Sequence, residues 1–318
     1  MESAAPLVSI ITPSFNQGGF IEETILSIQN QSYKHIEHII IDGESTDQTL
    51  AVLKKYSSSI VWISKPDTGQ TNAINKGLKK SHGDIIAYLN SDDLYLPDTI
   101  KTVVDYFAEH PGVDMVYGDV IHIDDQSRII EQVETGTISL AKFLTCQVYL
   151  PQPTVFFRKD IMEKIGFFDE RLHLAMDMDY WIRIFLAGKA AYIPRVLAKA
   201  RFYSKTKSSV GYLKNFYEWM YILEKTFSND ERTIDYFGSR DHTTSVKTNA
   251  WAYVYFFGGL RFLRHRKLST AIPSILRGMK LKPQLAFNPY LFWSVFVFVF
   301  GTQMSEHLSY FLPRFKKV

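Results

Sequence analysis

Two adjacent carboxylates, Asp92 and Asp93, follow an apolar stretch and precede Leu-Tyr-Leu-Pro. Neighbouring anions repel each other unless a cation joins them. A hard divalent ion such as Mg²⁺ or Mn²⁺ takes one or two carboxylates and completes its shell with phosphate oxygens. The pair therefore predicts a metal site for a diphosphate ligand. The alternative is that the two residues cap a helix that begins near Pro97.

A second acidic segment, Asp-Gly-Glu-Ser-Thr-Asp at 42–47, also follows a strand-like run. Ser-Thr-Asp is good capping chemistry for a following helix. The functional interpretation is that Asp42 accepts hydrogen bonds from a base or ribose while Asp47 caps that helix. Each acidic motif is a weak signal alone, but both stand at the end of an apolar run.

The elements that must position these residues are short strands alternating with helices. We expect strands at 7–12, 38–41, 61–63 and 84–89, and helices at 22–29, 49–56 and 71–80. Such alternation predicts an α/β fold with a mostly parallel sheet, whose ligands bind beyond the carboxyl ends of the strands. After about residue 210 the alternation stops, and the pattern of the remaining residues predicts helices rich in Tyr, Phe and Trp. We therefore expect two regions, 1–210 and 211–318.

Five ordered motifs over about residues 7–202 resemble family 2 glycosyltransferases of the GT-A fold. They are Thr-Pro-Ser-Phe-Asn at 12–16, Asp-Gly-Glu-Ser-Thr-Asp-Gln-Thr at 42–49, Pro-Asp-Thr-Gly-Gln…Ala-Ile-Asn-Lys-Gly at 66–77, Gly-Asp-Ile-Ile-Ala-Tyr-Leu-Asn-Ser-Asp-Asp at 83–93 and Met-Asp-Met-Asp-Tyr-Trp at 176–181. The resemblance implies a Rossmann-like GT-A domain with a C-terminal helical extension. It also implies an inverting, metal-dependent transfer of a sugar from a nucleotide diphosphate donor to an acceptor hydroxyl, in polysaccharide or glycoconjugate synthesis.

By position, the resemblance implies a set of donor-binding residues. Those expected to line the nucleotide pocket or close over it are Thr12, Ser14, Asn16, Asp42, Asp67, Gln70, Asn75 and Asn90, and those expected to hold Mn²⁺ or Mg²⁺ are Asp92 and Asp93. Asn75 could equally be a buried packing residue. Two departures matter. Asn90 stands where many members have Asp, so the ribose contact would be neutral, and Asp42-Gly43-Glu44 replaces the usual Asp-Asp-Gly.

The segment 175–181 contains the candidate base. Asp177 occupies the position of the Asp in the Glu-Asp pair that family members commonly show, and inversion needs a carboxylate that takes the acceptor proton. Asp179 lies two residues further on, and we interpret it as a cap or as the partner of Arg183. Trp181 and the pair Gln152-Pro153 could flank the acceptor, with core packing as the alternative.

The positive charge is concentrated in the C-terminal region. Residues 249–318 contain ten Lys or Arg and one acidic residue, whereas the first 248 contain 26 Lys or Arg and 32 acidic residues. The apolar run at 290–300 is too short for the roughly 20 residues that span a bilayer, but it could lie in the interface of an anionic membrane. The alternative is that these aromatics pack against the catalytic domain or a second subunit.

Composition narrows the remaining classes of function. The first residues lack a secretory signal and Cys146 is the single cysteine, so we expect a cytoplasmic protein, peripheral at the inner face of the cell membrane if the C-terminal region binds lipid. A sugar nucleotidyltransferase would carry a basic Gly-rich loop after the first strand, and residues 12–19 lack Lys and Arg. In a non-catalytic nucleotide-sugar-binding protein we would expect the metal motif or the base motif to be interrupted. Asn90 is the only residue that points to this. No nucleic-acid recognition motif or histidine zinc motif occurs.

Overall fold

The computed structural model describes residues 5–203, 211–228 and 230–300 of the 318-residue chain. The chain divides into two compact units. We call residues 1–140 with 149–209 unit 1, and residues 141–148 with 210–318 unit 2. The segment 141–148, which the sequence placed in the first region, groups with unit 2. Residues 301–318, which carry part of the predicted basic region, lie outside the described residues.

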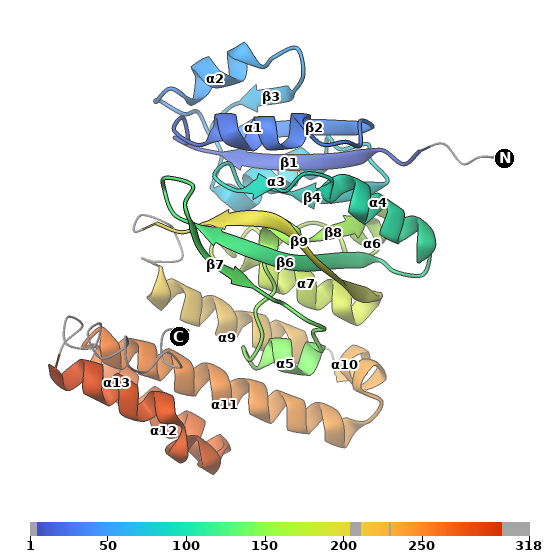
Figure 1. Ribbon diagram of the computed structural model, residues 1–318. Coiled ribbons are helices and arrows are strands. Elements are labelled where there is room, and N and C mark those ends of the chain that lie inside the picture. Colours follow the sequence, from blue (N-terminus) through green and yellow to red (C-terminus); the bar gives the residue numbers. More distant parts are fainter. Residues whose placement is uncertain (1–4, 204–210, 229, 301–318) are drawn as a thin grey trace. The chain divides into compact units, whose positions relative to one another are not determined.

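Unit 1 is built on a nine-stranded sheet in the order β3-β2-β1-β4-β8-β6-β9-β5, with β7 paired to β6 (Figure 1). The strands are β1 (Val8–Ser14), β2 (Ile36–Asp42), β3 (Val61–Ser64), β4 (Ile85–Tyr88), β5 (Leu94–Tyr95), β6 (Met115–Ile123), β7 (Ile129–Val133), β8 (Phe156–Arg158) and β9 (Ala190–Arg201). The predicted α/β fold is confirmed. The sheet is parallel through β3-β2-β1-β4 and between β6 and β9, and antiparallel where β8, β7 and β5 join it.

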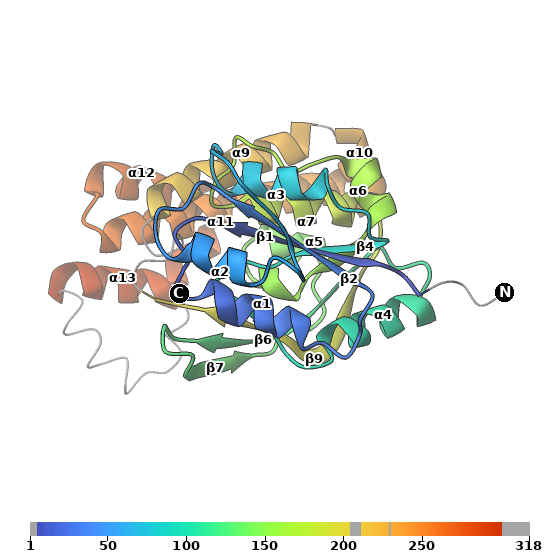
Figure 2. The same cartoon turned by 90° about the horizontal axis from the view of Figure 1, so that it is seen from above.

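Helices cover both faces of this sheet. They are α1 (Ile21–Gln29), α2 (Thr49–Lys55), α3 (Gln70–Leu78), α4 (Thr99–Glu109), the 3-10 turn η1 (Gln152–Thr154), α6 (Lys159–Ile165) and α7 (Met176–Ala187). Figure 2 shows α1, α2 and α4 along one face and α3, α6 and α7 along the other. Ile40 packs with α1 and α2, whereas Ile39 and Ile41 pack with Ala73 of α3. This alternation is the two-residue period of a strand whose two faces are both buried.

Strand β9 is the main element that the sequence did not predict. Its pairing with β6 jumps from Tyr117 opposite Tyr192 to Asp119 opposite Val196, so residues 193–195 bulge out of register. Pro194 lies in this bulge, where its missing N–H costs no ladder hydrogen bond. A proline inside an uneven apolar pattern hides a strand from sequence analysis. The strand ends at Arg201, which reaches the site described below.

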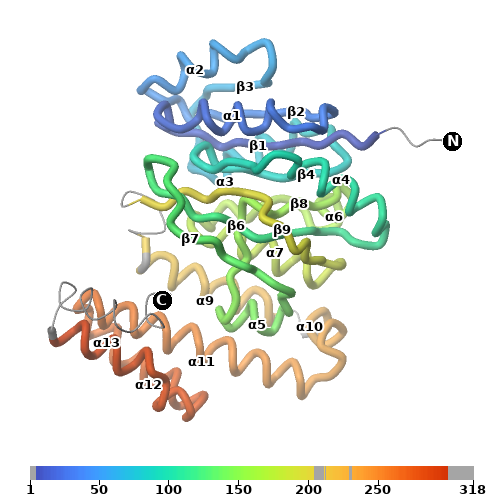
Figure 3. The backbone as a smooth tube through the Cα atoms, viewed as in Figure 1, coloured from blue at the N-terminus to red at the C-terminus, as the bar shows by residue number. Residues whose placement is uncertain are grey.

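Unit 2 is helical, as predicted for the C-terminal region. Its elements are α5 (Leu140–Leu144), which begins at the unit boundary, α9 (Tyr212–Ser228), α10 (Asp230–Phe237), α11 (Arg240–Arg264), α12 (Leu268–Leu281), the 3-10 turn η2 (Pro283–Phe287) and α13 (Pro289–Phe300). The helices α11 and α12 lie side by side in Figures 1 and 3, and Phe216 of α9 packs edge-on against Phe262 of α11. Among the described residues, no helix is both long and apolar enough to cross a bilayer.

Candidate active site

A cavity of about 580 Å³ lies in unit 1 at the carboxyl ends of β1 and β4. Its walls come from the loops that follow β1, β3 and β4, from the end of β9 and from the start of α7. Pockets of roughly 300–1,000 Å³ hold small molecules and cofactors. The cavity stands where parallel α/β sheets bind their ligands.

Most of the predicted site residues come together in this cavity. Those that line it are Ser14, Asp67, Gln70, Asn90, Asp92, Asp93, Gln152, Pro153 and Asp177. The candidate metal ligands and the candidate base therefore share one space, although they are more than 80 residues apart in the chain.

The two adjacent carboxylates differ in their surroundings. Asp93 is 5% exposed, and its two oxygens accept hydrogen bonds from the Arg201 backbone N–H at 2.8 Å and from Asn90 Nδ2 at 3.0 Å. Burial, together with the charge of Asp92, raises the pKa of the Asp93 carboxyl well above its usual range. Asp92 is half-buried. Both oxygens of Asp93 thus already accept hydrogen bonds from protein groups. Asp92 is the carboxylate better placed to bind a ligand.

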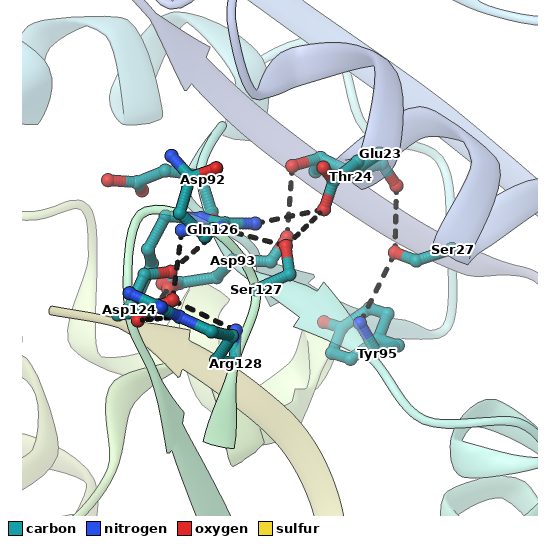
Figure 4. A network of polar contacts seen from close by, with 11 residues as sticks. Glu23, Thr24, Ser27, Asp92, Asp93, Tyr95, Asp124, Gln126, Ser127 and Arg128 are labelled. Carbon is teal, nitrogen blue, oxygen red and sulfur yellow. Dashed lines mark hydrogen bonds and ion pairs between the residues drawn. The ribbon is translucent and has the colours of Figure 1, made fainter. Parts of the chain in front are cut away.

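The Arg201 side chain fixes the backbone at Asp92 through a hydrogen bond. Its side chain is fully buried, and Nε donates to the Asp92 carbonyl at 2.9 Å. The two terminal nitrogens donate to Glu23 at 3.0 Å, to the Asp124 carbonyl at 2.9 Å and to the Ser127 hydroxyl at 3.0 Å. Figure 4 shows Glu23, Asp124 and Ser127 gathered near Asp92. The position of Asp92 therefore depends on α1, on the turn between β6 and β7, and on the end of β9.

Asn90 uses both ends of its amide. Its oxygen accepts from Gln70 Nε2 at 2.7 Å, and its nitrogen donates to Asp93 and to Gln152 Oε1, each at 3.0 Å. A carboxylate at this position could accept from Gln70 but could not donate to Asp93. The amide therefore avoids a third carboxylate beside Asp92 and Asp93, which gives a physical reason for the departure from Asp.

Three residues predicted for the nucleotide pocket lie outside the cavity lining. Thr12 is fully buried, and its hydroxyl is 2.9 Å from His38 Nε2. Asp42 is fully buried and accepts hydrogen bonds from the backbone and hydroxyl of Ser45 and from the hydroxyl of Ser64. Asn16 accepts from the Thr46 backbone N–H at 2.8 Å. Asp42 and Asn16 thus have partners in the turn that follows β2, Thr12 has its partner in β2, and none of the three side chains is part of the cavity lining.

Two further predicted residues pack behind the site. Asn75 donates to the Phe168 carbonyl at 2.9 Å and accepts from its N–H at 3.0 Å, so the packing alternative describes it. Trp181 is fully buried, and its ring stacks on Tyr88, which does line the cavity. Trp181 therefore supports the cavity wall and does not reach an acceptor directly.

The two aspartates at the start of α7 have different environments. Asp179 is buried and pairs with Arg183 at 2.9 Å, as its spacing on the helix predicted. Asp177 is half-buried, lines the cavity, and accepts from the Met178 backbone N–H at 2.9 Å. Of the two, only Asp177 is among the residues that line the cavity.

Several ring-bearing side chains of the cavity are not among the residues predicted from the sequence. Phe15 is 59% exposed at the cavity, and Tyr149, His173 and Tyr203 also line it. Burial, with a smaller contribution from the charge of Asp92, raises the pKa of Tyr203, so its hydroxyl stays protonated and donates to Asp92 at 3.3 Å. Phe15 lies inside the motif at 12–16, so the sequence carries a signal for it. The other three come from segments whose sequence carries no signal.

Comparison with known sequences gives consistent matches. Residues 9–166 match the family described as Glycosyl transferase family 2. An uncharacterised glycosyltransferase of Mycobacterium tuberculosis is 32% identical over 202 residues, which cover 62% of this chain and 76% of that protein. A PGL/p-HBAD biosynthesis glycosyltransferase of Mycobacterium bovis is 30% identical over 187 residues, covering 57% of this chain and 71% of that protein.

Solved structures share the fold at lower identity. Residues 1–349 of TarS from S. aureus, in complex with UDP-GlcNAc, superpose with a TM-score of 0.63 at 19% identity, covering 88% of this chain and 91% of that one. The mannosyltransferase PcManGT from Pyrobaculum calidifontis, in complex with GDP-Man and Mn²⁺, gives a TM-score of 0.60 at 16% identity, covering 92% and 84%.

Proposed function

The chain belongs to glycosyl transferase family 2, and from this membership we propose that the unit 1 cavity transfers a sugar, with inversion, from a nucleoside diphosphate donor to an acceptor hydroxyl. The acceptor would be a saccharide or a lipid-linked molecule, in the synthesis of a polysaccharide or glycoconjugate. The observation that carries this proposal is that Asp92 and Asp177 line the same cavity in a GT-A fold.

The donor end of the cavity is the side formed by the loops after β1 and β3. Phe15 offers an exposed ring on which a nucleobase can stack. The Ser14 hydroxyl is buried, and within the described part of the chain it has no hydrogen-bond partner. A buried polar atom of this kind is costly unless a ligand satisfies it. Both features support a nucleotide at this end.

The acidic pair fits a magnesium or manganese ion. In the described ranges, no group of three or more His, Cys, Asp or Glu side chains could hold a metal by itself. A site for these ions that is completed by substrate phosphates needs only one or two carboxylates. Asp92 would hold the ion, with Asp93 behind it. When bound, a divalent ion neutralises charge on a departing diphosphate.

Asp177 is the proposed general base. Its carboxylate takes the proton of the acceptor hydroxyl while that oxygen forms a bond to the anomeric carbon. The bond from this carbon to the diphosphate oxygen breaks, and its electron pair leaves with the nucleoside diphosphate. The Met178 N–H, which donates to one Asp177 oxygen, orients the carboxylate for this role.

Calorimetry with UDP and GDP tests the metal and donor assignments. We expect binding in the presence of Mn²⁺ that is lost on adding EDTA and lost in Asp92→Asn. The matched control is Asp105→Asn, which removes an exposed carboxylate paired with Lys101 on α4. Equal affinity with and without EDTA would overturn the metal assignment.

We also propose that unit 2 holds the enzyme at the cytosolic face of an anionic membrane. Large aliphatic and aromatic side chains are exposed on α12 and α13, namely Leu268, Ile272, Leu276, Phe292, Val295 and Val299. Residues 249–300 contain seven Lys or Arg and no acidic residue. An apolar face flanked by cations suits the interface of an anionic bilayer, where each positive charge contributes about 1 kcal/mol.

A further inference from the structure

A second cavity, of about 550 Å³, lies within unit 2 along one face of α11. Arg240, Thr243, Lys247, Trp251 and Tyr255 contribute to its lining, and their spacings of three and four residues place them on one side of the helix. Leu281 at the end of α12 closes one side. The cavity is therefore a trough whose chemistry is set mainly by one helix.

The charged groups of this trough are all positive. Among the described residues that line it, Arg240 and Lys247 are charged and none is acidic. Arg277 of α12 is not part of the lining, but its guanidinium lies 5.7 Å from the centre of the Tyr255 ring, which is. A cavity lined by two cationic residues and no carboxylate favours an anionic ligand, and carboxylate and phosphate groups form strong charge-assisted hydrogen bonds with Arg and Lys.

The apolar part of the trough consists of two aromatic rings together with Ile234 and Leu281. Trp251 and Tyr255 stack on each other with ring centres 5.6 Å apart and planes 30° apart, and both are half-buried. Flat rings beside polar groups match a ligand that has an apolar face and a polar edge. A pyranose ring has this shape, whereas an inorganic anion has no apolar face to place there.

We propose that this trough is a second ligand site, which binds an anionic saccharide, a sugar bearing carboxylate or phosphate groups. A bilayer is the less suitable occupant, because the rings are half-buried in a concave wall while the exposed aliphatic side chains lie on α12 and α13. Such a site would keep an acidic acceptor or product glycan bound to the enzyme. That use rests on the proposed transferase function, whereas the binding itself does not.

Calorimetry on the full chain tests the site with four probes: a galacturonic acid tetramer, glucose 6-phosphate, neutral maltotetraose and inorganic phosphate. We expect at least one of the two anionic sugars to bind about tenfold or more tightly than both maltotetraose and phosphate. Which of the two binds distinguishes a carboxylate ligand from a phosphate ligand. The double variant Arg240→Ala/Lys247→Ala should weaken this binding about tenfold, and Trp251→Ala should weaken it as well.

The controls separate this site from the donor cavity and from a damaged fold. Lys267→Ala removes an exposed cation outside the trough lining and should leave the binding unchanged. Lys247→Arg, which keeps the charge, should retain binding, and all variants should still bind UDP with Mn²⁺. Equal affinity for maltotetraose, equal affinity for inorganic phosphate, or no binding of either anionic sugar would each overturn the proposal.

Discussion

At the scale of single residues, the adjacent carboxylates Asp92 and Asp93 have different roles. Arg201 and Asn90 occupy both oxygens of Asp93, while Asp92 lies at the cavity with its backbone fixed by the Arg201 side chain. A carboxylate that must meet a cation benefits from a fixed backbone, because less freedom is lost when the ligand binds. The residue that fixes it lies more than 100 positions away in the chain.

His38 makes the stability of unit 1 sensitive to acid. Burial lowers the pKa of His38 to about 3, whereas in the unfolded chain an imidazole binds a proton near pH 6.5. Between these two values the unfolded state holds a proton that the folded state lacks, so stability falls as the pH falls. From pH 7 to pH 5 we expect a loss of about 2 kcal/mol from this group.

Urea denaturation at pH 7 and pH 5 measures this effect. In His38→Gln the side chain can still pair with Thr12 but cannot titrate, so the difference between the two pH values should shrink by about that amount. His35→Gln, at an exposed histidine, is the matched control and should leave the difference unchanged. An unaltered pH dependence in His38→Gln would show that another group is responsible.

The sequence predicts which residues stand near the site better than it predicts where their side chains point. Strand ends identified Ser14, Asn90 and Asp92, which line the cavity. Thr12 and Asp42 also lie near strand ends, but their side chains turn inward to partners that only the folded chain brings close. The unequal roles of Asp92 and Asp93 could not be predicted either, because they depend on distant Arg201.

At the scale of elements, the contact between α3 and β1 sets one wall of the cavity. Gln70, the first residue of α3, lines the cavity, and Gly77 near the other end of the helix lies against Ile11 of β1. A Cβ atom at position 77 would lie 2.4 Å from Ile11 Cγ2, well inside van der Waals contact. The absence of a side chain thus allows this close approach.

We expect Gly77→Ala to destabilise the protein by about 1–3 kcal/mol through overpacking, although alanine is the better helix former by about 1 kcal/mol. Thermal or urea unfolding measures the change. The control is Gly112→Ala, where a Cβ atom would have no neighbour within 4 Å. A stabilised Gly77→Ala variant would mean that helix propensity outweighs the contact with β1.

Local pattern predicted the strands and helices of the first half of unit 1 but not β5 and β9. The strands β1, β2 and β4 consist largely of buried residues with several Ile or Val, whereas the short β3 (Val-Trp-Ile-Ser) is exposed or half-buried, and α1 between β1 and β2 shows apolar residues at helical spacing. By contrast, β5 has two residues and β9 is interrupted by the bulge at Pro194. Their pairing partners are set by the fold and not by their own composition.

At the scale of the whole molecule, charge is divided between the two parts of the chain. The first 248 residues carry an excess of six negative charges and residues 249–318 an excess of nine positive charges. A positive surface is attracted to anionic lipid, and salt screens that attraction, whereas insertion of apolar side chains is not screened. The two contributions to membrane binding can therefore be separated.

We expect the purified chain to bind anionic vesicles at low salt, to bind them more weakly as salt is added, and to bind neutral vesicles poorly. The double variant Leu276→Ser/Phe292→Ser should weaken the salt-resistant part, because both side chains are exposed on unit 2. Ile129→Ser, at an exposed side chain of β7 in unit 1, is the control. Cosedimentation measures all of these, and no binding to anionic vesicles at low salt would contradict the membrane proposal.

The central claim is that one cavity both binds the donor and performs the transfer, with Asp177 as the base. The most direct test is the rate at which Asp177→Asn releases nucleoside diphosphate from a saturating nucleotide sugar, with its donor affinity measured in parallel. We predict a rate about 10²–10⁴-fold below that of the unmodified protein, with donor affinity retained. A rate that Asp177→Asn preserves and Asp179→Asn abolishes would contradict the account.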